Sequence, residues 1–150
     1  MLELIATATI TVSSALLFGY WFRYTCLLIL NTKAARDYTS VVAMANQLQV
    51  LEVQSALPAA ASADLDRLHQ LLERDYKVLG HLFRKAGASG DGEIEERMLG
   101  LYYRVMGLGY GISRSFSQAI ARKALEEMSL VVAHFANALG ERTLSATAAA

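Results

Sequence analysis

Histidines next to acidic residues are the first candidates for metal chemistry in this chain, because helical bundles hold di-iron sites through Glu-x-x-His pairs. The sequence has three histidines, at positions 69, 81 and 134, and no glutamate lies three residues before any of them. A His-Glu-x-x-His zinc motif is also absent. We therefore interpret His69 and His81 as solvated and His134 as a hydrogen-bonded bundle residue, and we expect neither a metal nor another cofactor.

Nucleophilic chemistry has equally little support in the sequence. Cys26, the single cysteine, has no histidine near it along the chain, and no serine stands in a Gly-x-Ser-x-Gly turn. The GLGYG stretch at 107–111 lacks both the GxGxxG spacing and the preceding strand of a dinucleotide-binding loop. We therefore predict that the protein is not an enzyme.

Asp75 is the polar residue with the strongest physical argument. It interrupts an apolar seam at heptad spacing, whose other members are Leu65, Leu68, Leu72, Leu79, Leu82 and Ala86. A buried carboxylate without a partner is strongly disfavoured. Because Arg97 and Arg104 lie seven residues apart beside the apolar stripe of the following helix, we predict that one of them pairs with Asp75 and fixes the helix register. The alternative is a binding-site carboxylate.

Residues 93–116 carry two apolar faces and a glycine face. The cleanest stripe consists of Ile94, Met98, Leu101, Val105, Leu108, Ile112 and Phe116. The second face includes Leu99, Tyr103, Met106 and Tyr110, which predicts a central helix covered on more than one side. Gly100, Gly107 and Gly111 lie on a third face and favour close approach of a neighbouring helix. The alternative is a pocket for a small apolar or aromatic ligand beside Tyr103, Met106 and Tyr110.

Apolar periodicity places these residues on long helices. The single proline, Pro58, and the scarcity of strand-like runs predict an all-α fold. We predict helices over 64–86, 93–116 and 117–140, ended by glycines at 87 and 140, with a loop at 88–93 where Asp91 is an N-cap. No glycine or proline interrupts 31–57, so the N-terminal helix is expected to continue through this stretch. The result is a transmembrane helix that continues into an antiparallel four-helix bundle.

The N-terminal segment has the length and composition of a membrane span. Residues 4–22 carry no charge, and nineteen helical residues extend about 28 Å, close to the thickness of the hydrocarbon core. The aromatic residues Tyr20, Trp21 and Tyr24 are typical of a membrane interface, where Arg23 would also lie. A cleaved signal peptide is the alternative, but Glu3 stands where such peptides carry basic residues. We favour a retained anchor.

Basic residues follow this span and none precedes it. Arg23, Lys33 and Arg36 therefore predict a single-pass protein of the inner (plasma) membrane with its N-terminus outside and its domain in the cytoplasm. A register of 11–30 would place Arg23 within the lipid at a cost of about 2.5–3.5 kcal/mol. In the favoured register, residues 26–30 contact protein and not lipid. The predicted domains are an anchor over 1–24, a bundle over 25–144 and a disordered tail over 145–150.

Charge and composition limit the partners. The 14 basic and 14 acidic residues give no basic face, so we do not expect nucleic-acid binding. We expect contact with the lipid bilayer and with a protein partner or a second copy. The sequence thus predicts a membrane-anchored helical bundle that acts as an interaction or assembly module. The alternative is a tethered sensory or regulatory module that binds a small apolar or aromatic ligand.

Overall fold

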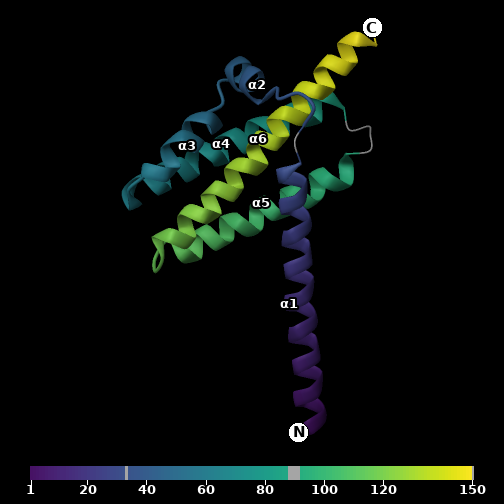
Figure 1. The fold of residues 1–150 in the computed structure, drawn as a ribbon, viewed down its shortest axis with the longest axis vertical. Helices are drawn as coiled ribbons and strands as arrows, with labels where there is room; N and C mark the ends of the chain where they lie inside the picture. The colour runs from purple at the N-terminus through teal and green to yellow at the C-terminus, as the bar shows by residue number, and fades with distance from the viewer. Residues whose placement is uncertain (33, 88–91, 150) are drawn as a thin grey trace. The chain divides into compact units, whose positions relative to one another are not determined.

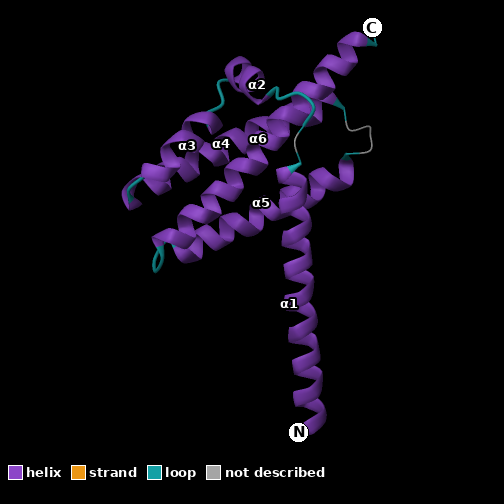
Figure 2. Ribbon diagram, in the orientation of Figure 1, coloured by secondary structure: helices purple, strands orange, loops and turns teal. Residues whose placement is uncertain are grey.

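The all-α prediction is confirmed by the computed structural model, which describes residues 1–32, 34–87 and 92–149. Within these ranges every regular element is a helix (Figures 1 and 2). The elements are α1 (Leu2–Asn31), α2 (Thr39–Asn46), α3 (Val50–Ala56), a 3₁₀ turn η1 (Leu57–Ala59), α4 (Ser62–Ala86), α5 (Glu93–Ser113) and α6 (Gln118–Ala148). The chain forms two units, Met1–Lys33 and Ala34–Ala150. The predicted cap Asp91 lies outside the described residues.

The first unit is helix α1, which is long and apolar enough to cross a membrane. By length and composition, a helix of this kind near an N-terminus is compatible with a membrane anchor or a signal sequence. Its threonines do not leave free hydroxyl donors. The Oγ1 atoms of Thr7, Thr9 and Thr11 each donate to the carbonyl four residues earlier, at 2.8 Å. These threonine hydroxyls are therefore satisfied within the helix itself.

The predicted continuation of α1 as far as residue 57 is wrong. The helix ends at Asn31, and two short helices, α2 and α3, follow. Two backbone N–H groups that would donate to helix carbonyls in a continuous helix donate to side chains instead. Asp37 Oδ1 accepts the Thr39 N–H at 2.9 Å, and Asn137 Oδ1 accepts the Tyr38 N–H at 2.6 Å. A second break follows at Gln47, which has left-handed backbone geometry with φ 53°. One local and one long-range hydrogen bond thus stabilise the start of α2, and two short helices stand where one was predicted.

Helix α6 forms the centre of the second unit. It packs against α2, α3, α4 and α5. The apolar periodicity of 117–140 predicts a seam of Ala121, Ala124, Met128, Val131, Phe135 and Ala138, and burial confirms it at all of these except Ala138. The seam predicted for α4 is confirmed at Leu65, Leu68, Leu72 and Leu79, and α4 ends at Gly87 as expected, with φ 79°. The second unit therefore contains three long helices, with α2 and α3 in place of a fourth.

The face of α5 that is buried is not the face that its strongest apolar stripe predicts. The buried residues are Leu99, Tyr102, Tyr103, Tyr110 and Ser113. The expected principal stripe is largely exposed, including Leu108 at 70% and Ile112 at 67%. We refer to five of these exposed residues as the outer stripe: Ile94, Leu101, Val105, Leu108 and Ile112. Helix α5 is thus a peripheral helix with one face on α6, and its predicted central position is wrong.

Gly140 does not end α6. The helix continues to Ala148, so residues 145–148 of the predicted disordered tail are helical. Gly140 is buried instead where the chain entering α2 crosses α6, and a Cβ built there would lie 2.5 Å from Tyr38 Cβ. The missing side chain therefore permits a close approach between two segments. The predicted domain limits at residues 24 and 144 otherwise stay a prediction.

Candidate functional site

A groove between α4 and α5 is the candidate functional site of the second unit. It has a volume of about 360 Å³, and we call it the α4–α5 groove. Its lining residues are Tyr76, Lys77, Gly80, Phe83, Arg84, Glu96, Arg104 and Phe135. Helices α4 and α5 both pack on α6, so Phe135 of α6 contributes to the groove from beneath. A neighbouring hollow shares Tyr76, Glu96 and Arg104 and extends the groove along α5.

Aromatic rings form the floor of the α4–α5 groove. Tyr76 and Phe83 lie seven residues apart on one face of α4. Tyr76 stacks on Tyr103 with ring centroids 4.0 Å apart, and Phe83 meets Phe135 edge to face at 5.8 Å. Gly100 gives room for this arrangement, since a Cβ at that position would lie 3.1 Å from the Tyr76 hydroxyl. The expected close approach at Gly100 is thus made by a tyrosine side chain.

The rim of the groove is mainly cationic. Lys77, Arg84 and Arg104 line it as exposed basic residues. Glu96 is the one acid among the described lining residues, and Arg142 pairs with it. Burial raises the pKa of Glu96, and the positive charge of Arg142 opposes that shift. The surface therefore combines apolar rings with excess positive charge, which suits a partner carrying apolar and acidic groups.

Asp75 does not form the arginine pair that the sequence predicts. Its carboxylate is fully buried, and Oδ2 accepts the Gln49 N–H at 2.6 Å, just before α3 begins at Val50. Burial raises the pKa of Asp75, while hydrogen bonds from the Gln49 and Val50 backbone oppose the shift.

The two arginines have other partners. Arg97 pairs with Glu93 one turn away on α5, and Arg104 lies beside the Tyr76 hydroxyl at the groove. The prediction is wrong because Asp75 of α4 faces α3. Arg97 and Arg104 belong to α5 and lie along the groove, on the other side of α4.

The residues predicted to form a ligand pocket are separated in the structure. Tyr103 is buried under Tyr76, and Met106 is half-buried. Tyr110 lines a different, polar hollow of about 360 Å³, where its hydroxyl donates to Asp66 Oδ1 at 2.6 Å. The groove lies on another face of the tyrosine pair and was not identified from the sequence. The i, i+4, i+7 spacing of Tyr76, Gly80 and Phe83 is the signal that indicates it.

Two of the three histidines pack against neighbouring side chains. His69 stacks on Tyr110 with ring centroids 4.6 Å apart, and burial lowers its pKa. It is therefore half-buried and not fully solvated as expected. His134 Nε2 lies 3.0 Å from Glu95 Oε1, consistent with a hydrogen-bonded bundle residue. Within residues 1–32, 34–87 and 92–149, no group of three or more His, Cys, Asp and Glu side chains is placed to hold a metal ion.

A buried polar pair was missed by the sequence reasoning. The Tyr102 hydroxyl donates to Glu127 Oε2, and both side chains are buried between α5 and α6. Glu127 lies directly before the seam residue Met128, one turn after Ala124 and one turn before Val131, so it borders the seam of α6. This position beside the seam is the signal that points to it. The pair adds a buried polar contact to the interface between α5 and α6.

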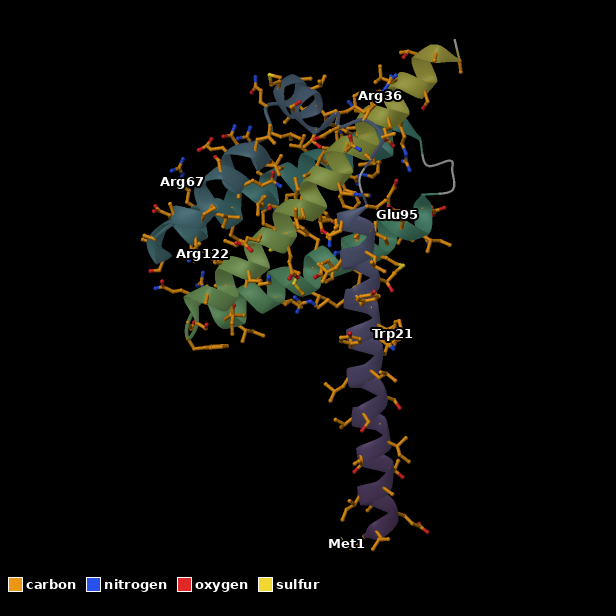
Figure 3. The ribbon with its side chains drawn as sticks, viewed as in Figure 1. Met1, Trp21, Arg36, Arg67, Glu95 and Arg122 are labelled. Carbon is orange, nitrogen blue, oxygen red and sulfur yellow. The ribbon has the colours of Figure 1, made fainter. Side chains whose placement is uncertain are left out.

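The predicted membrane-interface residues lie together on α1. The rings of Tyr20, Trp21 and Tyr24 are exposed, with centroids 6.0–6.3 Å apart (Figure 3 labels Trp21). Arg23 lies among them in the sequence and is exposed. Their assignment to a lipid–water interface stays a prediction.

Comparisons with known proteins give no relative for this chain. No family model, no curated protein and no solved structure matches it. The function must therefore be argued from the geometry of the chain itself.

Proposed function

We propose that this protein is a single-pass, membrane-anchored helical module that binds a partner protein through the α4–α5 groove. The observation that carries the proposal is the aromatic floor of Tyr76, Phe83 and Phe135 beneath a basic rim. Aromatic and arginine side chains are the residues that most often dominate the energy of protein interfaces. The partner would present an apolar segment with acidic side chains. Absence of catalysis stays an expectation of this proposal.

The anchor is the first part of the proposal to test. We expect the full chain to stay in the membrane fraction after an alkaline carbonate wash, and its intact mass to include residues 1–24. Since the basic residues Arg23 and Arg36 follow the apolar run, a C-terminal reporter should be active on the cytoplasmic side. A shortened chain released into the soluble fraction would identify α1 as a signal sequence. Activity of a reporter that works only outside the cytoplasm would reverse the topology.

Site-specific photocrosslinking tests the groove. A benzoylphenylalanine at Lys77, on the groove rim, should crosslink one protein partner in membranes from the native host. The matched control is Gln70, which is exposed on the same helix two turns earlier and does not line the groove. In the Lys77-labelled chain, the double substitution Arg84→Glu and Arg104→Glu should abolish the adduct. Arg67→Glu, which changes an exposed arginine paired with Glu52 elsewhere on the surface, should not (Figure 3).

The outcomes of this experiment separate the two candidate functions. Equal crosslinking from positions 70 and 77, or an adduct that survives the double substitution, would contradict partner binding in the groove. The second candidate is a small aromatic or apolar ligand, which is favoured by a volume within the range of roughly 300–1,000 Å³ seen for ligand sites. Native mass spectrometry of the purified chain would then detect a bound small molecule, and the Lys77 probe would give no protein adduct.

A further inference from the structure

The outer stripe of α5 is a long apolar surface. Ile94, Leu101, Val105, Leu108 and Ile112 are all exposed, and the separation of 18 positions from the first to the last corresponds to about 27 Å of helix. Phe116 and Ile120, which follow α5 in the sequence, are also exposed, by 69% and 55%. Such an extended exposed patch marks an interaction surface.

The charge beside this surface changes along α5: Glu93, Glu95 and Glu96 flank Ile94, and only basic residues follow from Arg97 onward. From Arg97 to Leu125 the sequence contains no acidic residue and carries the basic residues Arg97, Arg104, Arg114, Arg122 and Lys123. Arg114 is partly neutralised by Asp66, 2.9 Å away, and Arg122 donates to the Ala60 carbonyl. Lys123 and Arg104 are exposed and have no acidic partner among the described contacts. An apolar stripe with basic flanks is typical of helices that lie in the plane of an anionic membrane surface.

A second copy of the chain fits this surface less well. Arg97 and Arg104 lie along one edge of the outer stripe, as the 3.6-residue helical repeat requires. If two α5 helices paired antiparallel through their stripes, each basic edge would face its own symmetry mate. Like charges in that position are unfavourable. Charge therefore favours an anionic surface over self-association.

The short distance along the chain between α1 and the second unit also favours a membrane surface as the partner of the outer stripe. The span predicted over residues 4–22 is followed by nine more residues of α1, about 14 Å of helix, and the second unit begins three residues later at Ala34. At no more than about 3.6 Å per residue, the connection from Asn31 adds roughly 10 Å. If α1 spans the bilayer, the second unit is held within about 25 Å of the lipid headgroups, at high effective concentration. A weak surface contact would then be sufficient to orient the domain.

We propose that the outer stripe of α5 lies in the interface of an anionic lipid bilayer. The inference depends on the anchor in the proposed function but not on the groove. Leu108 and Ile112 would enter the boundary between headgroups and acyl chains, while Arg104 and Lys123 would meet lipid phosphates. The domain would then have a fixed orientation, with the α4–α5 groove opening beside the membrane. The partner site would accordingly be restricted to segments close to the bilayer.

Depth measurements on spin labels test the proposal in the full chain. In a Cys26→Ser background, a nitroxide is attached to Leu108→Cys, Ile112→Cys or the control Gln70→Cys, and the protein is reconstituted into phosphatidylcholine vesicles with 30% phosphatidylglycerol. Labels at 108 and 112 should collide at least threefold more with oxygen than with a water-soluble nickel complex, relative to the label at 70. Removing phosphatidylglycerol should reduce this ratio, because the basic flanks lose their partners.

Other outcomes would overturn the inference. Labels at 108 and 112 that are as accessible to nickel as the label at 70 would show a solvated stripe. Labels shielded from both reagents, with dipolar coupling between chains, would show that a second copy covers it. Both labelled leucine and isoleucine positions are exposed, so the substitutions remove little core packing. Flotation of the same vesicles tests the anchor separately, and circular dichroism checks that each variant is folded.

Discussion

Replacing Asp75 with leucine is expected to lower the free energy of unfolding by about 2–3 kcal/mol. The substitution leaves the Gln49 N–H, and the Val50 N–H beside it, without the buried carboxylate that accepts from them. Each unsatisfied buried donor costs about 1–3 kcal/mol, so the two together cost about 2–6 kcal/mol, of which burial of the leucine side chain recovers only roughly 1.5–3 kcal/mol. The loss should be measured by urea titration of the detergent-solubilised chain, followed by near-ultraviolet circular dichroism of its tyrosines.

Asp75→Asn is the matched control. Its amide oxygen can still accept one of the two backbone donors, so we expect a smaller loss of about 1 kcal/mol. The asparagine also cannot titrate. Because burial raises the pKa of Asp75 in the folded chain, its protonation contributes stability that is fully present below the ordinary pKa of 3.8 and is lost as the pH rises through the raised value.

The pH profile separates the two roles of this carboxylate. The stability advantage of the unmodified chain over Asp75→Asn should decrease as the pH is raised from about 4. A difference that does not change with pH would mean that the folded and unfolded chains bind this proton equally well. If Asp75→Leu is as stable as the unmodified chain, Asp75 does not support the start of α3.

Gly140→Ala is the second substitution with a large expected effect, a loss of about 1–2 kcal/mol. Alanine has the higher helix propensity, by about 1 kcal/mol, so a solvated site in α6 would be stabilised. At Gly140 the new Cβ would lie 2.5 Å from Tyr38 Cβ and 3.1 Å from Val42 Cγ2. Tyr38 Cβ is next to the backbone and cannot rotate away, so the chain entering α2 must move. Overpacking of this kind costs about 1–3 kcal/mol.

Gly80→Ala is the control for this substitution. Gly80 lies inside α4, and nothing stands within 4 Å of a Cβ built there. We therefore expect a gain of up to about 1 kcal/mol in the same urea titration. Gly140→Ala should also make residues 34–38 more sensitive to proteolysis. The added Cβ would displace Tyr38 and so weaken the hydrogen bond from its N–H to Asn137. Equal stabilisation by both substitutions would contradict the packing of this segment on α6.

Local patterns predicted the features that depend on neighbours in the sequence. The periodic leucines of α4, with Gly87 after them, predicted that helix almost to the residue, because capping and amphipathicity are local properties. The seam of α6 was likewise visible in its small and apolar residues. Asp75 was recognised as buried from its place in a heptad. These conclusions needed no knowledge of what each face would contact.

By itself, then, the sequence determined an all-helical chain with an apolar N-terminal helix, the buried faces of α4 and α6, and the need to satisfy Asp75. Tertiary structure decided which group satisfies it and where helices break. The Tyr38 N–H is accepted by Asn137, 99 residues away, and no local pattern contains that information. Periodicity also identifies an apolar face of α5 without stating whether protein covers it. Whether a helix face is buried depends on which other helices pack against it. Helix α6 packs against the tyrosine face of α5 and leaves the outer stripe exposed.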